Sequence, residues 1–204
     1  LKREGKNIDV VVVVSKRGNT YILDRESGLS LFKISKKRSP VSNVPGEKTS
    51  PYQLKVDLPE PICRNRMTEN ELSNLPYVNK KKLKEIFSKS ETGFPIPPKI
   101  GTKNIQLAGC VRWAGASIDT KKNIMYVSAD QSPYFVSIIK NPGWIGQYTH
   151  KWEKFVDEKN YPAVKPPWGS IVALNLNSGK IIWKIPFGEW EDLKKMNIKK
   201  TGTY

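Results

Sequence analysis

The chain has 204 residues, and its 35 Lys and Arg against 19 Asp and Glu give a formal net charge of +16 at pH 7. With 38% hydrophobic residues, among them 6 Trp, 8 Tyr and 6 Phe, it is too rich in large apolar groups to be disordered throughout. Its longest apolar run, Val10–Val14, is far shorter than the roughly 20 residues of a transmembrane helix. Residues 1–7 lack a start methionine and the apolar core of a signal peptide, so we expect an internal segment of a longer protein.

The strong positive charge is compatible with binding to nucleic acid or to another anionic surface. However, the basic residues are spread over several stretches, which include Lys33–Arg38, Lys80–Lys84 and Lys194–Lys200. No recognition helix, zinc-finger spacing or aromatic RNA-binding strand accompanies them. We therefore predict no nucleic-acid partner and interpret most of the charge as solvated surface lysines.

The cysteines and the histidine give no metal-binding pattern. Cys63 and Cys110 lie far apart in the chain, without the close pairing of a zinc or redox motif. Both a disulfide and two unpaired, partly buried thiols are compatible with this spacing. His150 has no His or Cys at metal-ligand spacing, so we interpret it as a surface or packing residue.

The first predicted element is an antiparallel hairpin. The β-branched run Ile8–Val14 and the strand-like Thr20–Asp24 flank a turn that contains Gly18 and Asn19. A second turn, over residues 25–28, ends in Ser-Gly, where the preceding Asp can accept hydrogen bonds from the turn backbone. The sequence therefore predicts strand, turn, strand and turn.

A long interruption, residues 36–103, follows this hairpin and is rich in Pro, Lys, Ser and Asn. Thr68, with a Glu three residues later, predicts a capping box and one helical turn. Asn79 is a good N-cap for a helix over Lys80–Lys89, whose apolar residues share one side. The Pro-rich stretch Phe94–Pro98 is expected to be extended.

Two further units of strand, turn and strand come later in the chain. One joins Trp113–Asp119 to Ile124–Ala129, and the other joins Gly169–Asn175 to Lys180–Ile185. Residues 140–167 form a second expected insertion between them. The turn sequence LNLNSG of the last unit aligns with LDRESG in the first hairpin. Repeated short antiparallel units with a periodic aromatic residue are typical of a β-propeller.

Six stretches along the chain match one known family in order: Ser15–Gly28, Phe94–Thr102, Leu107–Asp119, Met125–Val136, Lys165–Trp183 and Ile185–Glu189. Together they resemble the membrane-bound glucose and quinate dehydrogenase type of quinoprotein, which uses pyrroloquinoline quinone (PQQ). The run KPPWG, leading into an A-x-N-x-x-S-G-x-x-x-W blade signature, is the most specific part. The resemblance implies that residues 1–204 are an all-β segment of an eight-bladed β-propeller. That segment would hold about three four-stranded antiparallel blades, interrupted by the long, partly helical insertions 36–103 and 140–167.

The resemblance also implies the chemistry. Such enzymes oxidise a sugar or polyol with PQQ beside calcium (or magnesium) and pass electrons to ubiquinone. A carboxylate acts as general base on the alcohol while hydride passes to the quinone. In the family this base precedes the Ser15–Gly28 stretch by more residues than stand before it here, so we expect it upstream of Leu1 and expect the segment alone to be inactive. The metal ligands remain unassigned.

Lys16 is the first cofactor-binding candidate. In the family, the basic residue in the turn before Tyr-Ile-Leu-Asp-Arg reaches the ortho-carbonyl oxygens of the quinone, and Lys16 holds that position here. A fixed ammonium there would stabilise the negative charge that develops as the quinone is reduced. The alternative is an exposed lysine of a hairpin turn.

Asp130 is the second cofactor-binding candidate. Relatives carry an asparagine near this point, and a carboxylate beside an anionic quinone is unfavourable unless a cation or a proton compensates it. The alternative role for Asp130 is to cap a turn at the end of a strand. Trp113, Trp168 and Trp183 are better explained as residues that pack the blades than as groups that stack on the quinone.

Two hypotheses about the whole protein therefore compete. The first is a periplasmic dehydrogenase, attached to the inner membrane through a region that is absent from this sequence. The second is a non-enzymatic propeller that serves as a binding or assembly scaffold, which Asp130 in place of Asn and Cys110 in place of Gly would favour. The substrate and the oligomeric state are not specified by these residues.

Overall fold

The computed structural model describes residues 1–204 except 65, 94–95, 108, 113–114 and 204. Most of its regular elements are strands. The strands are β1 (Lys2–Arg3), β2 (Lys6–Asn7), β3 (Val10–Val14), β4 (Thr20–Asp24), β5 (Ile34–Arg38), β6 (Tyr52–Val56), β7 (Glu91–Thr92), β8 (Asn104–Leu107), β9 (Ser117–Asp119), β10 (Ile124–Asp130), β11 (Pro133–Lys140), β12 (Tyr148–Lys154), β13 (Gly169–Asn175) and β14 (Ile181–Pro186). The helices are the 3₁₀ turn η1 (Glu69–Glu71), α1 (Lys80–Ser88) and α2 (Glu191–Lys195).

The predicted first hairpin is confirmed. Strands β3 and β4 pair antiparallel, from Val10 opposite Asp24 to Val14 opposite Thr20. In the turn that follows, Asp24 Oδ1 accepts hydrogen bonds from the backbone N–H groups of Ser27 at 2.7 Å and Glu26 at 3.0 Å. These bonds, the one from Ser27 above all, hold the pKa of the Asp24 carboxyl below its usual range.

The same turn recurs in the C-terminal unit, as the sequence alignment predicted. Asn175 Oδ1 accepts hydrogen bonds from the backbone N–H groups of Asn177 at 2.9 Å and Ser178 at 3.0 Å. Gly28 and Gly179, which end the two turns, both have φ near +71°, a conformation that favours glycine. The shared sequence therefore encodes a shared backbone geometry.

The strands form small sheets, two of which have four strands among the residues described. The first has the order β14-β13-β10-β9 and is antiparallel throughout, and the second has the order β12-β11-β8-β7. The expectation of purely antiparallel blades is wrong at one point, because β7 pairs with β8 in parallel. A parallel pair needs a long connection, and residues 93–103 provide it. The pairs β1-β2, β3-β4 and β5-β6 complete the strands.

In chain order, the hairpin β11-β12 lies between β10 and β13, which are neighbouring strands of one sheet. Strands β10 and β13 are paired over their full length, from Ile124 opposite Asn175 to Asp130 opposite Gly169. The hairpin between them in sequence belongs to the other four-stranded sheet. The expected second insertion, residues 140–167, starts at the last residue of β11 and contains β12.

The region of residues 36–103 contains the expected helical turn and helix, together with β6, β7 and most of β5, which the sequence did not predict. Helix α1 begins after Asn79, whose side chain accepts a hydrogen bond from Lys82 N–H, and Leu83 is its buried residue. Glu71 accepts hydrogen bonds from Thr68, as a capping box requires. Strand β6 pairs with β5, which carries much of the basic run Lys33–Arg38. Phe94 and Pro95 of the Pro-rich stretch lie outside the described residues.

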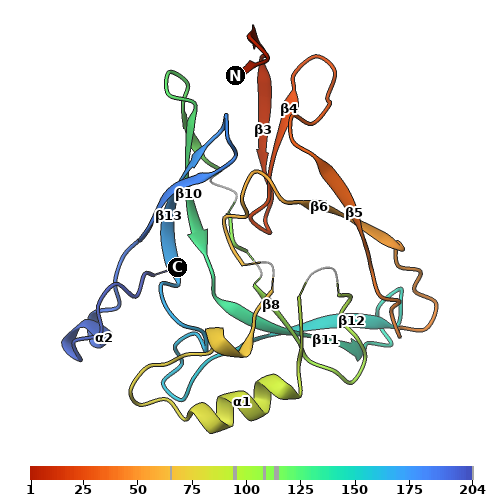
Figure 1. Ribbon diagram of the computed structural model, residues 1–204. Helices are drawn as coiled ribbons and strands as arrows, with labels where there is room; N and C mark the ends of the chain where they lie inside the picture. The colour runs from red at the N-terminus through yellow and green to blue at the C-terminus, as the bar shows by residue number, and fades with distance from the viewer. Residues whose placement is uncertain (65, 94–95, 108, 113–114, 204) are drawn as a thin grey trace.

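Two hydrophobic cores support these sheets. One surrounds Trp168, Phe155 and Leu83, and the other surrounds Ile22, Met125 and the two cysteines. In Figure 1, β3-β4, β10-β13 and β11-β12 run in different directions around the molecule, and α1 lies beside the β11-β12 region. The second core therefore joins the first hairpin to the four-stranded sheet that contains β10 and β13.

Candidate functional site

Lys16 and Asp130, which sequence analysis selected separately, line the same cavity of about 690 Å³. Lys16 comes from the turn between β3 and β4, and Asp130 ends β10. Arg112, Tyr134 and Trp152 also line this cavity. The fold therefore brings together two cations, one carboxylate and an aromatic wall.

The turn that carries Lys16 is held by hydrogen bonds within the turn and by packing against Cys110. Ser15 N–H donates to the Asn19 carbonyl at 2.8 Å, and Gly18 N–H donates to the Ser15 carbonyl at 2.8 Å. Gly18 has φ +82°, and a Cβ at this position would lie 2.6 Å from Cys110 Sγ. The turn is therefore packed against the cysteines, while Lys16 itself is exposed.

Cys63 and Cys110 form a disulfide, with Cα atoms 6.1 Å apart, which decides between the two alternatives left open by their spacing. Both residues are buried. Cys110 accepts a hydrogen bond through its carbonyl from Asp130 N–H at 2.8 Å, and Ile62 N–H donates to the Gly18 carbonyl at 2.9 Å. The disulfide therefore links the backbone beside Lys16 to the backbone of Asp130.

The Asp130 side chain is only 7% exposed, and both of its oxygens have partners. Oδ1 accepts a hydrogen bond from Ser132 N–H at 2.8 Å, and Oδ2 forms an ion pair with Arg112 Nη2 at 3.0 Å. The first contact is the expected turn cap. The second places a cation beside the carboxylate and so balances its charge.

Sequence reasoning missed Arg112 as a site residue. It stands two positions after Cys110 in a stretch that was recognised only as part of the family resemblance. A signal was available, because the resemblance implies an asparagine near position 130. An Asp there would need a nearby cation beside an anionic cofactor, and Arg112 precedes the strand that ends in Asp130. Its side chain is 61% exposed, so the guanidinium can pair with Asp130 and still face the cavity.

The aromatic residues divide into core and surface groups. Trp168 is fully buried, as a packing role requires, whereas Trp183 on β14 is 39% exposed and lies 5.9 Å from the ring of Tyr126. Trp113 lies outside the described residues. His150 is exposed with its ring edge-on to Trp152, which confirms that it is a surface residue.

Across residues 1–204, apart from the seven positions excluded above, no three or more His, Cys, Asp or Glu side chains come together as a metal site would require. In the same part of the chain, no helix has the length and apolar character needed to cross a membrane.

Curated relatives of the chain are bacterial quinone-dependent dehydrogenases. It is 23% identical to quinate/shikimate dehydrogenase (quinone) of Acinetobacter baylyi over 97% of the chain, and 21% identical to probable quinate dehydrogenase (quinone) of Xanthomonas campestris pv. juglandis over 97%. It is 19% identical to quinoprotein glucose dehydrogenase A of Acinetobacter calcoaceticus over 93%. The chain spans 27%, 28% and 27% of the length of these three relatives.

A family model extends this similarity to the entire sequence. The model described as the β-propeller domain of PQQ-dependent glucose/ethanol/alcohol dehydrogenases matches residues 1–204. The match agrees with the small, mostly antiparallel sheets and the repeated turn. The chain belongs to the β-propeller domain family of the PQQ-dependent glucose, ethanol and alcohol dehydrogenases.

Proposed function

We propose that the whole protein oxidises a hydroxyl group of a sugar or polyol with PQQ and passes the electrons to ubiquinone. The observation that carries this proposal is that Lys16 and Asp130, which come from distant parts of the sequence, line the same cavity. The relatives named above for quinate and glucose, and a glycerol dehydrogenase large subunit from Gluconobacter oxydans, support this class of substrate.

The described residues fit an anionic quinone. The cavity of about 690 Å³ is within the usual size of a cofactor site, and two of its lining residues, Lys16 and Arg112, are cationic. When bound, PQQ would supply the electron acceptor for the alcohol carbon. The Lys16 ammonium would face the quinone oxygens and stabilise negative charge there more strongly in the transition state than before reaction.

Arg112 and Asp130 would act together at this cavity. The ion pair neutralises a carboxylate that would otherwise repel an anionic cofactor. The hydrogen bond from Ser132 N–H fixes the other carboxylate oxygen and so holds the pair in one orientation. We therefore interpret the Asp as compatible with cofactor binding, which favours the enzyme over the scaffold.

The remaining parts of the proposal concern metal and location. Calcium or magnesium belongs to the proposal by family resemblance, and the described residues bring together no cluster of three or more His, Cys, Asp or Glu side chains to hold it. A periplasmic location is supported by the Cys63–Cys110 disulfide, because such bonds persist in oxidising compartments. Attachment to the inner membrane is the part of the proposal that rests on the family resemblance.

Replacing Lys16 tests the proposed function directly. In the whole protein supplied with PQQ and calcium, we expect Lys16→Ala to lower kcat about 100-fold, the effect of losing one fixed electrostatic donor. Lys16→Arg keeps the charge and is expected to retain more activity. The measurement is the reduction of an artificial electron acceptor with a panel of sugars and polyols.

The control for this series is Lys122→Ala, which removes an exposed lysine from the turn between β9 and β10. We expect it to leave kcat unchanged. Equal activity of Lys16→Ala and Lys122→Ala would contradict the role of Lys16. A wild-type protein that neither binds PQQ nor oxidises any substrate would overturn the enzymatic proposal and favour the scaffold.

A second experiment tests the compensation between Arg112 and Asp130. We expect Arg112→Ala to weaken PQQ binding about tenfold, since a nearly buried carboxylate would lose its cation and repel the cofactor. Adding Asp130→Asn should recover most of this loss. Titration of the apo-protein with PQQ, followed by cofactor absorbance, measures the effect, and a double variant no better than Arg112→Ala would refute the compensation.

A further inference from the structure

A second cavity, of about 600 Å³, shares no lining residue with the one that Lys16 faces. Its lining includes the cations Arg64 and Lys184, together with Ile62, Gln131 and Pro167. Arg64 belongs to the segment that follows Cys63, whereas Lys184 lies on β14. Two cations from distant parts of the chain therefore face one open space.

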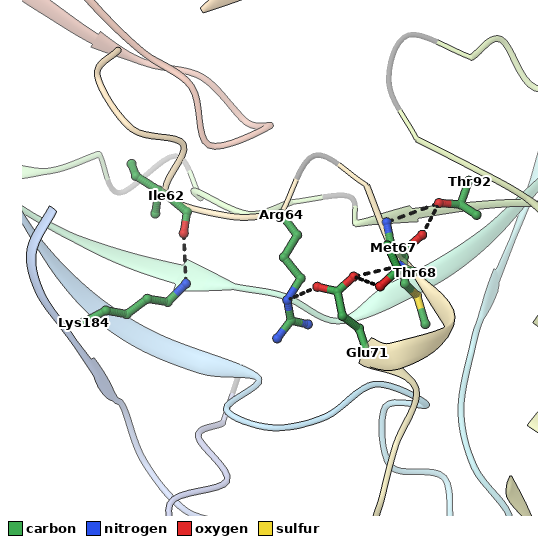
Figure 2. Close-up of polar contacts among 7 residues, drawn as sticks. All are labelled: Ile62, Arg64, Met67, Thr68, Glu71, Thr92 and Lys184. Atoms are coloured by element: carbon green, nitrogen blue, oxygen red, sulfur yellow. Dashed lines mark hydrogen bonds and ion pairs between the residues drawn. The ribbon is translucent and has the colours of Figure 1, made fainter. Parts of the chain in front are cut away.

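The contacts of Arg64 leave part of its guanidinium without a partner. Arg64 Nε forms an ion pair with Glu71 Oε1 at 2.9 Å, on the side away from Lys184 (Figure 2). Its Nη1 atom is buried and has no hydrogen-bond acceptor among the described residues. A buried N–H group without an acceptor is costly, so this atom is suited to a ligand oxygen.

Lys184 is the second unbalanced cation. Its Nζ donates to the backbone carbonyl of Ile62 at 3.0 Å, which is a neutral acceptor (Figure 2). Burial lowers the pKa of Lys184 to about 8, and the positive charge of Arg64 adds to this shift. Among the residues that the structure describes, no carboxylate forms an ion pair with Lys184, so the ammonium is held in an unfavourable environment.

The neighbouring carboxylates do not balance these two charges. Glu71, beside Arg64, also accepts hydrogen bonds from the Thr68 N–H at 2.7 Å and the Thr68 hydroxyl at 3.1 Å. Glu60, near the start of β14, pairs with Lys180 at 3.0 Å and accepts the N–H of Ile181 at 2.8 Å. Glu71 therefore pairs with Arg64 and Glu60 with Lys180, and among the described residues neither carboxylate forms an ion pair with Lys184.

We propose that the space between Arg64 and Lys184 binds a small oxyanion, such as the carboxylate or phosphate group of a metabolite. One ligand oxygen would accept a hydrogen bond from Arg64 Nη1 and another from Lys184 Nζ, with charge-assisted bonds on both sides. The site is independent of the proposed dehydrogenase activity. Because it adjoins Cys63, its ligand would also stabilise the segment that carries the disulfide.

The test uses calorimetric titration of the whole protein with sulfate, as a tetrahedral probe, and with acetate, as a planar one. We expect Lys184→Met to weaken binding of the preferred anion about tenfold. Lys180→Met, at the lysine directly before the same strand, is the control and should leave binding unchanged. Tighter sulfate binding would identify a phosphate site, and tighter acetate binding a carboxylate site. Equal affinity of wild type and Lys184→Met would overturn the proposal.

Proton uptake gives a second measurement that needs no variant. Anion binding should raise the pKa of Lys184 from about 8, so the wild type should take up protons on binding at pH 8.5 and almost none at pH 6.5. Neither probe changes its own protonation between these pH values. Titrations in buffers of different ionisation enthalpy measure the uptake, and its absence at pH 8.5 would contradict the assignment of Lys184.

Discussion

The double substitution Cys63→Ala/Cys110→Ala is expected to lower the free energy of unfolding by about 4 kcal/mol. The disulfide joins residues that are 47 positions apart, and the chain entropy that a cross-link of this span removes from the unfolded state corresponds to roughly that value. Both cysteines lie in the core beside Ile22 and Met125, so the loss of packing acts in the same direction. Urea unfolding of the whole protein without reductant measures the difference.

The disulfide should also affect the candidate site. Gly18 packs against Cys110 Sγ, and the Cys110 carbonyl accepts the N–H of Asp130, so loosening the cysteines frees both sides of the cavity. We therefore expect weaker PQQ binding in the double variant. Adding a reductant to the wild type in mild urea is the control and should reproduce the shift. A change in unfolding free energy below about 1 kcal/mol would show that the bond has little structural role.

The parts of the fold that could be predicted from the sequence are those whose causes are local. The turn after β4 forms because Asp24 accepts backbone N–H groups two and three residues ahead and Gly28 takes a positive φ. The turn after β13 repeats this arrangement through Asn175. Helix α1 likewise begins where Asn79 caps it. Each of these structures depends on residues within one short window.

The parts that could not be predicted depend on distant residues. The pairing of β10 with β13 spans the whole β11-β12 hairpin, and nothing in the hydrophobic pattern of residues 125–136 indicates that the chain leaves one sheet and enters another. The Cys63–Cys110 bond had an equally acceptable alternative, because cysteine spacing does not report distance in space. The ion pair of Arg112 with Asp130 similarly depends on the tertiary fold, which brings the Cys110 carbonyl within hydrogen-bond distance of the Asp130 N–H.

The candidate site was accessible to sequence reasoning mainly through family resemblance. Composition and spacing alone favour an exposed turn lysine at position 16 and a turn-capping carboxylate at position 130. The structure contains both of these local features and also places the two residues at one cavity. The second cavity, at Arg64 and Lys184, has no counterpart in any motif, because its two cations are joined only by the tertiary fold.

Trp168 is the residue of the KPPWG run whose replacement should affect stability most. Its side chain is fully buried, its Nε1 donates to the Val164 carbonyl at 2.8 Å, and its ring stacks on Tyr161 at 5.9 Å between centroids. We expect Trp168→Ala to lower the free energy of unfolding by about 3–5 kcal/mol, since a large cavity would remain in this core. Urea unfolding followed by circular dichroism measures the change.

A graded series separates the packing of this residue from its hydrogen bond. Trp168→Phe keeps an aromatic ring but leaves the Val164 carbonyl without its donor, which should cost about 1–3 kcal/mol together with the lost volume. Trp144→Ala, at a side chain that is 60% exposed, is the control and should change stability by less than about 0.5 kcal/mol. If Trp168→Ala proved as stable as this control, the core around Trp168 could not be what holds β13 in place.

Because Gly169 pairs with Asp130 across β13 and β10, the destabilised variant should also bind PQQ more weakly, whereas Trp144→Ala should bind it normally.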